Sequence, residues 1–367
     1  MRILMLSKAC LVGSYYQRKL EEIARQPAVA LTVIVPPSWK DAQGEIKLER
    51  VYVEGYRLLA DPIVFNGRYH LHFYPHLGKR ISEFRPDLLH IDEEPYNFAT
   101  WHAWRLARRA KIKTLFFSWQ NLERRYPFPF GLMERQVLQG VDYAIVGSQG
   151  SADVWRRKGY GGPLAIIPQF GVDPEIFSPA GRRDSGRGFV IGYVGRLVPE
   201  KGVDVLIRAA AGLPGPWRLA IAGDGPERTT LLVLAKQLGV QDQVYFDGQL
   251  PSTRVPAYMQ QMDVLVLPSR SRPNWTEQFG RVLTEAMACG IVVLGSRSGE
   301  IPHVIGEAGW TFPEDNVDIL REQLLRLMQD ADLRAELGSA GRRRVLEKFT
   351  QARVAADNVQ VYKEILA

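Results

Sequence analysis

The residues with the most specific chemical pattern lie in the stretch Asn274-Trp-Thr-Glu-Gln-Phe-Gly-Arg-Val-Leu-Thr-Glu-Ala-Met-Ala-Cys-Gly290. Its two carboxylates, Glu277 and Glu285, are separated by seven residues, and a helix is expected to begin near Gly280. Two carboxylates can hydrolyse a glycosidic bond when they lie roughly 5–10 Å apart. Eight helical residues would rise about 12 Å. We therefore expect the two carboxylates to bind different parts of one extended ligand.

Two cationic side chains could bind the anionic part of such a ligand. Arg196 and Lys201 lie in Val194-Gly-Arg-Leu-Val-Pro-Glu-Lys-Gly202, between an expected strand and an expected helix. A guanidinium and an ammonium beside a helix N-terminus suit phosphate groups. The backbone N–H groups from Gly280 to Leu283 would offer phosphate a second binding position. Surface cations and ordinary helix capping are the plainer alternatives.

Glycines at two further turns would let the backbone approach the same ligand. The segment 221–227 begins like a dinucleotide fingerprint with Gly223 and Gly225, but Arg228 stands where the third glycine belongs. NAD binding is therefore weakly supported, and a turn that lies against a ligand, or a plain turn, explains the glycines better. Gly299 follows a later expected strand and would approach the same place.

Alternating strands and helices must position these loops. Buried runs rich in β-branched and aromatic residues alternate with helical patterns in both halves, which predicts parallel strands covered on both faces. The expected strands span residues 2–7, 30–36, 87–92, 114–119 and 142–147, and then 189–194, 217–222, 244–247, 263–268 and 291–294. The proline- and glycine-rich segment 168–188 between the two sets reads as a linker. We expect an α/β protein of two Rossmann-like domains with a ligand at the carboxyl ends of the strands.

Charge is distributed unevenly between the two halves. Residues 1–180 carry 24 Lys and Arg against 18 Asp and Glu, a net +6, whereas residues 181–367 carry 23 against 22, a net +1. Solvated helix faces explain this, and so does an N-terminal half that meets an anionic partner such as a lipid phosphate or a membrane surface. No nucleic-acid-binding module is recognised, so nucleic acid is not an expected partner. Two distant cysteines and no metal-ligand spacing favour a reducing cytoplasm and no metal site.

The C-terminal half resembles the retaining glycosyltransferases of family 4, which have the GT-B fold. The similarity covers residues 190–310 in the family's order and spacing, and it rests on Gly195-Arg196, Lys201-Gly202, Ala222–Pro226, Glu277 with Glu285, and Gly299–Pro302. Residues 166–177 resemble the family's interdomain segment. The resemblance implies an N-terminal domain at 1–180, a C-terminal domain at 181–348 that faces it across a cleft, and a helix at 349–367 that crosses back.

The resemblance implies transfer of a hexose-type sugar from a UDP- or GDP-sugar to an acceptor hydroxyl, with retention, in polysaccharide or glycoconjugate biosynthesis. Arg196 and Lys201 would hold the diphosphate and Glu277 a sugar hydroxyl, which makes these three the expected catalytic residues. Glu285 would bind the ribose. The other expected donor contacts are Gly13, Gly195, Gly223, Leu250, Gln278, Phe279, Gly280, Val282 and Leu283. Cations and helix dipoles would replace a metal, so no cofactor is expected.

The N-terminal half departs from the family pattern in two places. A glycine-rich loop often follows the first strand in the family, and here Gly13 is the one glycine of that loop. Many members place a histidine after the strand at 114–119, where this chain has Gln120 and Asn121. A neutral amide can hold a sugar hydroxyl but cannot act as a general base. Together with Asp92 and Glu94, these two residues are the expected acceptor contacts, although negative charge at a helix start is an alternative for the carboxylates.

Three alternatives stay open beside the transferase. A sugar-nucleotide epimerase of the same architecture would need a different set of acidic and histidine residues, and a phosphorylase would normally be much longer. A catalytically inactive nucleotide-sugar-binding protein is compatible with the absent histidine. The expected acceptor is a carbohydrate, a lipid-linked sugar or a small molecule, and the expected location is the cytoplasm, with peripheral contact to the inner face of an anionic membrane left open.

Overall fold

The structure is a computed structural model that describes residues 1–41, 44–179 and 188–367. The chain forms two compact units, one of Met1–Gly171 with Gln351–Ala367 and one of Val172–Thr350. The structure thus draws the division between residues 171 and 172, ahead of the expected boundary at 180 and 181. Residues 180–187 of the expected linker lie outside the described residues.

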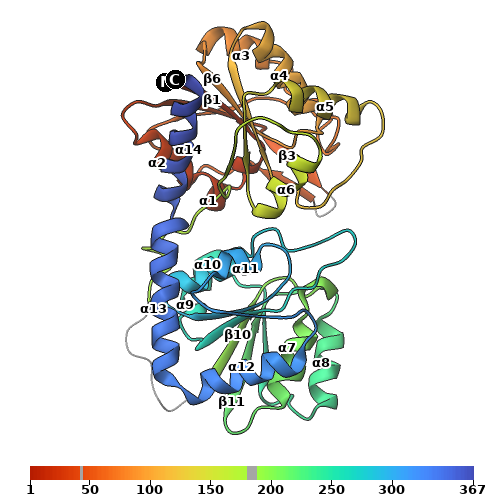
Figure 1. Cartoon of the computed structure of the whole chain (residues 1–367), viewed down its shortest axis with the longest axis vertical. Coiled ribbons are helices and arrows are strands. Elements are labelled where there is room, and N and C mark those ends of the chain that lie inside the picture. The colour runs from red at the N-terminus through yellow and green to blue at the C-terminus, as the bar shows by residue number, and fades with distance from the viewer. Residues whose placement is uncertain (42–43, 180–187) are drawn as a thin grey trace. The chain divides into compact units, whose positions relative to one another are not determined.

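The first unit is built on a parallel sheet (Figure 1). In the part of this unit that the structure describes, seven strands pair in the order β5-β2-β1-β6-β7-β8-β9. Their bounds are β1 Arg2–Ser7, β2 Ala30–Val35, β5 Arg57–Ala60, β6 Leu88–Asp92, β7 Lys113–Ser118, β8 Tyr143–Val146 and β9 Leu164–Ile166. The order reverses between β1 and β6, which is the position where open α/β sheets generally bind their ligands, at the carboxyl ends of the strands.

Both faces of this sheet are buried, as its apolar strands predict. On β1, Leu4 and Leu6 pack into one core while Ile3 and Met5 pack into the other, and all four are fully buried. Alternate side chains of a strand point to opposite faces, so each face needs its own helical cover. The covering helices are α1 Gly13–Tyr16, α2 Arg18–Ala24, α3 Leu77–Phe84, α4 Phe98–Arg109, α5 Phe130–Gly140, α6 Gln149–Arg157 and α14 Gln351–Leu366.

The last helix, α14, completes the first unit although it lies at the end of the chain. Val354, Val359 and Tyr362 are buried in one of its two cores. The hydroxyl of Tyr362 lies 2.8 Å from Nδ1 of His90 on β6, a hydrogen bond between buried side chains. Burial lowers the pKa of His90 well below its usual value. The helix implied at 349–367 is therefore present and belongs to the N-terminal unit.

The second unit repeats the architecture with a parallel sheet. Within residues 188–350, six strands pair in the order β12-β11-β10-β13-β14-β15. They are β10 Phe189–Val194, β11 Trp217–Ala222, β12 Val244–Gly248, β13 Val264–Leu267, β14 Val292–Ser296 and β15 Trp310–Phe312. The helices around this sheet are α7 Val203–Ala211, α8 Arg228–Gln237, α9 Val255–Met259, α10 Arg281–Ala288, α11 Ile301–Ile305, α12 Val317–Gln329 and α13 Ala331–Lys348. The expected fold of two Rossmann-like α/β units is confirmed.

The structure also contains strands that sequence patterns did not indicate. A hairpin of β3 Ser38–Asp41 and β4 Gly44–Lys47 stands apart from the main sheet of the first unit. The edge strands β5, β9 and β15 are only three or four residues long. Such short strands carry too few side chains for a periodic pattern to be visible.

Candidate functional site

Three loops at the carboxyl ends of β10, β11 and β12 lie backbone to backbone. The N–H of Gly195 donates to the carbonyl of Ala222 at 3.0 Å, and the N–H of Gly223 donates to the carbonyl of Gly248 at 2.7 Å. Gly223 has a φ of 149°, and a Cβ there would lie 1.8 Å from the carbonyl oxygen of Gly195. Only glycine fits such an approach. The predicted donor contacts Gly195 and Gly223 are thereby brought into one corner of the sheet.

The predicted catalytic residues Lys201 and Glu277 form an ion pair. Lys201 ends a single 3-10 turn ahead of α7, and its Nζ lies 2.6 Å from Oε2 of Glu277. The hydroxyl of Ser269, which follows β13, donates to the same oxygen at 2.8 Å. Glu277 is 8% exposed, so the pair is largely shielded from water and its charges interact strongly. The two residues are 76 positions apart in the sequence, yet the fold places them in one site.

Arg196 lies at the same edge with an exposed side chain. Among the described residues its guanidinium has no carboxylate or carbonyl partner, while its backbone carbonyl accepts a 2.8 Å hydrogen bond from the hydroxyl of Tyr193. Burial, and then the negative charge of Glu277, raises the pKa of Tyr193. The Tyr193 phenol therefore stays protonated and holds the loop through this backbone carbonyl. The Arg196 guanidinium itself is available to an anionic ligand.

The start of α10 differs in one respect from the expected phosphate position. Gly280 caps the helix in the left-handed region with a φ of 77°. The N–H of Leu283 already donates to the carbonyl of Gly280 at 2.8 Å, so this amide is not free as expected. The N–H of Val282 has no acceptor among the described residues. A phosphate at this helix start would therefore meet Val282 rather than Leu283.

The remaining predicted donor contacts of this unit differ in exposure. Phe279 is buried against the ring of Phe349, with centroids 5.7 Å apart, and the Leu283 side chain is fully buried. These two residues can therefore offer a ligand only backbone atoms. Gln278 has an exposed side chain, and Leu250 is half-buried in the loop after β12.

Glu285 lies in the second turn of α10, as the sequence predicted. Its Oε1 is 3.0 Å from Nε of Arg281, one turn earlier, and its side chain is largely buried. Burial raises the pKa of Glu285 above its usual value, although the charge of Arg281 opposes the shift. A carboxyl held in this way is suited to hydrogen bonds from vicinal hydroxyl groups.

The loop after β14 lies against the Glu277 segment. The N–H of Glu300 donates to the backbone carbonyl of Glu277 at 3.1 Å. Gly299 has a φ of 52°, and a Cβ there would lie 2.0 Å from that carbonyl oxygen. The sequence singled out Gly299 for close approach to a ligand, and the structure shows a close approach to the protein's own backbone, which fixes Glu277.

In the first unit, most of the predicted acceptor residues are buried, and their side chains form hydrogen bonds with other parts of the chain. Asp92 accepts from the hydroxyl of Ser7 at 2.5 Å and from the amide of Gln169 at 2.8 Å. Gln120 is 7% exposed and donates to the carbonyl of Leu122 at 3.0 Å. The two bonds to Asp92 tie the ends of β1 and β6 to the segment after β9, whereas the Gln120 bond is local to its own loop. Asn121 is half-buried.

Glu94 joins the carboxyl ends of β6 and β7. One of its oxygens accepts from the hydroxyl of Ser118 at 2.6 Å and the other from the N–H of Trp119 at 2.9 Å. Burial raises the pKa of Glu94 to about 7, although these hydrogen bonds oppose the shift. Glu94 is thus a carboxyl that changes its charge near neutral pH, beside the position where family members often carry histidine.

A cluster that the sequence did not reveal lies next to Glu94. The Nζ of Lys8, just after β1, lies 4.2 Å from the ring centroid of Trp39 and 4.0 Å from that of Tyr69. Glu93 accepts from the N–H of Lys8 at 3.3 Å and lies 3.6 Å from Nε2 of His72. Burial alone would raise the pKa of Glu93, but the charges of Lys8 and His72 hold it below its usual value. Lys8 and Glu93 follow strands at the switch point, which was a usable signal, whereas Trp39, Tyr69 and His72 come from a segment without periodicity.

Gly13 lies at the start of α1, where its N–H donates to Oε2 of Glu49 at 2.8 Å. A carboxylate of the chain thus takes the position that a ligand anion would take there. Substitution of Gly13 is restricted, since a Cβ would lie 2.8 Å from the side chain of Gln17. The structure therefore gives Gly13 a packing role, and its expected donor contact stays a prediction.

Glu94→Gln is expected to make the stability of the chain less dependent on pH. Between about pH 4.5 and 7 the folded state holds a proton that the unfolded chain has released, so the free energy of unfolding falls as the pH rises through this window. Glutamine keeps an acceptor for Trp119 and a donor for Ser118 but carries no such proton. We expect the stability of the variant relative to the natural protein, measured as the free energy of unfolding in urea, to be higher at about pH 8 than at about pH 5.

Glu93→Gln is the matched control for that measurement. The pKa of Glu93 lies below its usual value, so its ionised form stabilises the fold and its replacement should cost stability at about pH 8. An equal effect of Glu94→Gln at both pH values would contradict the assigned pKa direction.

The described residues show neither a metal-binding cluster nor a membrane-spanning helix. No group of three or more histidine, cysteine, aspartate or glutamate side chains in that part of the chain is placed to hold a metal ion. No helix in the same residues combines the length and apolar character needed to cross a bilayer.

Family models match both halves of the chain. The model described as "Glycosyltransferase Family 4" matches residues 21–176, and the model described as "Glycosyl transferases group 1" matches residues 178–344. The second match contains the Arg196 and Lys201 loop and the Glu277 and Glu285 segment, and the first contains the Glu94 cluster apart from Lys8.

Curated relatives and solved structures are similar to the chain over different lengths. A GDP-mannose-dependent alpha-(1-6)-phosphatidylinositol monomannoside mannosyltransferase of Mycolicibacterium smegmatis is 35% identical over 51% of this chain and 54% of its own length. A D-inositol 3-phosphate glycosyltransferase of Mycobacteroides abscessus is 32% identical over 56% of this chain and 49% of its own. The chain thus spans about half the length of these relatives. The Anabaena protein HepE in complex with UDP has a TM-score of 0.72 at 18% identity, over 99% of this chain and 100% of its own, which shows a shared fold.

Proposed function

This chain belongs to the family 4 glycosyltransferases, and from that premise we propose that it transfers a sugar from a nucleotide diphosphate donor to an acceptor hydroxyl. The observation that carries the proposal is the Lys201–Glu277 pair, 2.6 Å apart beside the Arg196 charge at the carboxyl ends of β10 and β13. A cation that holds a carboxylate in place, next to a second cation, suits a ligand with a diphosphate on one side and a hydroxylated sugar on the other.

The proposed donor is a UDP- or GDP-linked hexose. The M. smegmatis relative is named for GDP-mannose, and the HepE structure contains UDP, so both nucleotides are represented among similar proteins. We assign the diphosphate to Arg196, Lys201 and the N–H of Val282, the ribose to Glu285, and a sugar hydroxyl to Glu277. The base would lie beside the backbone contact of Gly195 and Gly223.

The proposed reaction retains the configuration of the anomeric carbon. The bond from that carbon to the diphosphate oxygen breaks, and its electron pair leaves with the diphosphate. The acceptor oxygen bonds to the same face of the carbon, and its proton passes to the departing diphosphate oxygen. Arg196 and Lys201 stabilise the charge that grows on the leaving group, which is the step where fixed cations lower the barrier most.

We assign the acceptor to the N-terminal unit, at the carboxyl ends of β1, β6 and β7. Glu94, Trp39, Tyr69 and Lys8 combine a titrating carboxyl, two aromatic rings and a cation there. Such a set can hold the hydroxyl groups of a sugar or an anionic group of a phosphorylated acceptor. The two relatives are named for inositol-containing acceptors, one of them lipid-linked, so both lipid-linked and small acceptors fit the proposal.

A nucleoside diphosphate is expected to stabilise the protein in the presence of EDTA. The reason is that Arg196 and Lys201 supply the positive charge that a metal would otherwise bring. At one hundred times the dissociation constant the gain is about 2.7 kcal/mol, which thermal melts detect as a rise in Tm. UDP and GDP should be compared with uridine and guanosine, which lack the phosphates. A gain that appears only after a divalent cation is added would contradict the metal-independent assignment.

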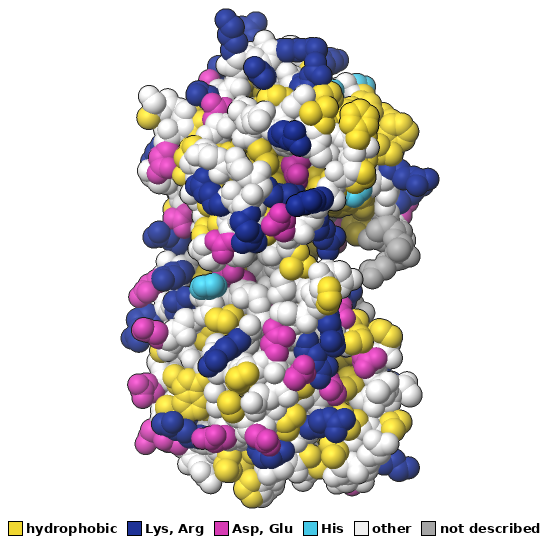
Figure 2. Space-filling view, turned by 45° about the vertical axis from the view of Figure 1, so that its right-hand side comes forward, with side chains coloured by type: hydrophobic (Ala, Val, Ile, Leu, Met, Phe, Trp, Pro, Cys, Tyr) yellow, Lys and Arg dark blue, Asp and Glu magenta, His cyan; other side chains and the backbone are white. Residues whose placement is uncertain are grey.

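We further propose that the N-terminal unit associates with anionic membranes. Exposed apolar side chains come from two segments, Phe65 and Leu71 from one and Phe128 and Leu132 from the other, and Phe128 is 83% exposed. The segments meet where the ring of His70 lies 5.4 Å from that of Phe130. Figure 2 shows a hydrophobic patch on this unit with Lys and Arg side chains beside it. Apolar side chains next to cations suit the boundary of an anionic bilayer.

Liposome flotation across a salt series tests the membrane proposal. We expect binding to vesicles with anionic lipid at low salt, a loss of binding as salt rises, and weaker binding of Phe128→Ser. Val233→Ser, which replaces an exposed apolar side chain of the second unit, is the control variant. Phe73→Ser would not serve as a control, because the Phe73 ring packs against that of Phe98 with centroids 5.3 Å apart. Binding that is indifferent to lipid charge would contradict the proposal.

A further inference from the structure

A pocket lies at the end of the N-terminal sheet opposite the proposed acceptor site. It has a volume of about 940 Å³ and is lined by the last turns of α4 and α5 and the first residues of β7. Glu94 of the proposed acceptor site accepts a hydrogen bond from Ser118, at the carboxyl end of β7. Lys113 and Thr114, at the amino end of the same strand, line the pocket. Six strand residues span about 20 Å at roughly 3.3 Å each, so the two places are separate.

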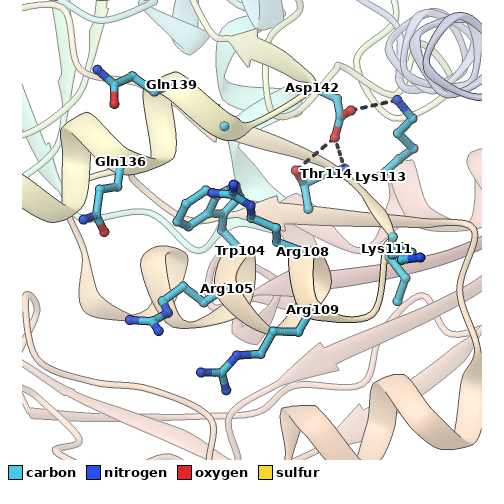
Figure 3. A pocket seen from close by; sticks show the side chains of 12 residues that line it. Trp104, Arg105, Arg108, Arg109, Lys111, Lys113, Thr114, Gln136, Gln139 and Asp142 are labelled. Carbon is cyan, nitrogen blue, oxygen red and sulfur yellow. Dashed lines mark hydrogen bonds and ion pairs between the residues drawn. The ribbon is translucent and has the colours of Figure 1, made fainter.

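The lining of this pocket is strongly basic. Five cationic side chains line it, Arg105, Arg108, Arg109, Lys111 and Lys113, against the single carboxylate of Asp142. Figure 3 shows Asp142 turned to one side, where its oxygens accept from Nζ of Lys113 at 2.9 Å and from the N–H of Thr114 at 2.9 Å. The Asp142 carboxylate is therefore already paired with Lys113. The side chains of the other four cationic residues, Arg105, Arg108, Arg109 and Lys111, form no ion pair or hydrogen bond with any described residue.

Two of the arginines are held in place by aromatic rings. The guanidinium of Arg108 lies 5.5 Å from the ring centroid of Trp104, and that of Arg105 lies 4.7 Å from the ring centroid of Trp101. Cation–π contacts of this kind orient a charge without neutralising it. Figure 3 shows Trp104 and Arg108 together in the middle of the pocket.

The polar groups left over in the pocket are mainly donors. Trp104 is 5% exposed, and its buried Nε1 has no hydrogen-bond partner. Gln136 uses its oxygen to accept from Nε1 of Trp101 at 2.7 Å, which leaves its NH₂ group. A buried N–H without an acceptor costs free energy. A ligand made of acceptors alone would satisfy it.

The helix dipole does not account for the whole arrangement. Cations near a helix C-terminus are favoured, which covers Arg108 and Arg109 in the last turn of α4. Arg105 lies one turn earlier, and Lys111 and Lys113 lie beyond the helix. Moreover, none of the four unpaired cations donates to a helix carbonyl among the described residues.

We propose that this pocket is a binding site for a ligand with clustered phosphate groups, distinct from the donor and acceptor sites. Guanidinium and ammonium groups with an indole N–H and an amide NH₂ match phosphate oxygens, which only accept hydrogen bonds. The volume is in the range of small-molecule sites, which is about 300–1,000 Å³. A soluble polyphosphorylated compound and a phosphorylated lipid headgroup share this chemistry. The proposal goes beyond sugar transfer and does not depend on it.

Calorimetric titration with inorganic tripolyphosphate tests the site. Arg105→Gln/Arg108→Gln removes two exposed cations of the pocket, and Arg68→Gln/Arg125→Gln removes two exposed cations of the same unit that lie outside it. Both variants keep Arg196 and Lys201, so binding of tripolyphosphate at the donor site is the same in both. We expect the first variant to lose the pocket's binding, with affinity at least about tenfold weaker, and the second to keep it.

A second variant separates this site from a diffuse charge effect. Trp104→Phe keeps the net charge and most of the packing but removes the buried N–H, so it should also weaken tripolyphosphate binding by about tenfold. Circular dichroism checks that it is folded. Tripolyphosphate affinity equal in the natural protein, Arg105→Gln/Arg108→Gln and Trp104→Phe would overturn the proposal.

Vesicle flotation assigns the source of the phosphates. If Arg105→Gln/Arg108→Gln loses both tripolyphosphate binding and flotation with vesicles that contain phosphatidylinositol 4,5-bisphosphate, a lipid with several phosphates, the ligand is a lipid headgroup. If it loses only tripolyphosphate binding, the ligand is a soluble compound. Nucleoside diphosphate stabilisation should be unchanged in either case, so failure here leaves the proposed donor site intact, and failure of the donor site leaves this pocket intact.

Discussion

Lys201→Ala and Arg196→Ala are each expected to lower turnover by roughly 10²–10³-fold, the effect of removing one group that stabilises charge in a transition state. Both side chains are assigned to the diphosphate, on which charge grows as the sugar leaves. Arg196 has an exposed guanidinium without a partner among the described residues, so its loss removes only the interaction with the ligand.

The loss of Lys201 should have a second consequence. Its Nζ is the cationic partner of Glu277, at 2.6 Å. Glu277 is only 8% exposed, so alanine at position 201 would leave a buried carboxylate without its cation. A buried charge that loses its partner is strongly unfavourable, so Lys201→Ala should also lower Tm, whereas Arg196→Ala should leave Tm nearly unchanged. Lys201→Arg keeps the positive charge. Its Tm should therefore lie closer to that of the natural protein than its turnover does.

Steady-state kinetics and thermal melts on the same preparations check this pair of results. Arg208→Ala is the matched control because Arg208 is an exposed cation on α7, the helix that follows Lys201. It should keep the natural rate. Folded Arg196→Ala and Lys201→Ala proteins with near-normal rates would remove both residues from the mechanism.

Glu277→Gln and Glu285→Gln are expected to fail in different ways. Glu285 is assigned to the ribose, so its replacement should weaken the bare nucleoside diphosphate by about 10–100-fold, as for a hydrogen bond to a charged group. Glu277 is assigned to the sugar, so its replacement should lower kcat or change sugar preference while the affinity for the bare nucleotide is kept. Titration of each variant with the nucleoside diphosphate, followed by kinetics with the full donor, measures both effects.

The surroundings of the two carboxylates make this comparison practicable. Burial raises the pKa of Glu285, so its ionised form is unfavourable in the fold and glutamine should not destabilise α10 through the loss of charge. Glu277 accepts from Ser269 and Lys201, and a glutamine oxygen can accept both of these hydrogen bonds. Equal loss of nucleotide affinity in the two variants would contradict the division of roles.

Much of the donor half could be predicted from the sequence because its signals are local. The expected strands at 189–194 and 217–222 coincide with β10 and β11, since buried runs between glycine turns leave little freedom of register. Glu285 lies in the second turn of α10 because the glycine at 280 fixes where the helix begins. What the sequence could not give was the pairing of Lys201 with Glu277, which depends on how β10 and β13 lie beside each other.

The N-terminal half was harder to predict for physical reasons. Trp39, Tyr69 and His72 lie in residues 36–76, where short strands and turns give no period to recognise. Asp92 was expected to contact an acceptor, but its hydrogen bonds to Ser7 and Gln169 come from strands and loops far away in the sequence. The cation cluster at 105–113 was visible, whereas the pocket around Trp104 depends on how α5 packs against α4.

The most direct measurement of the central claim is turnover of a panel of nucleotide sugars by the purified protein in EDTA, followed by mass spectrometry. The account predicts that one or more UDP- or GDP-sugars are converted to the nucleoside diphosphate, with the sugar joined to an acceptor or, in its absence, slowly to water. It also predicts that Arg196→Ala greatly slows this release and that Arg208→Ala does not. Tight binding of a nucleotide sugar without release of nucleoside diphosphate, with or without acceptors or added metal, would contradict the account and leave a nucleotide-sugar-binding protein in its place.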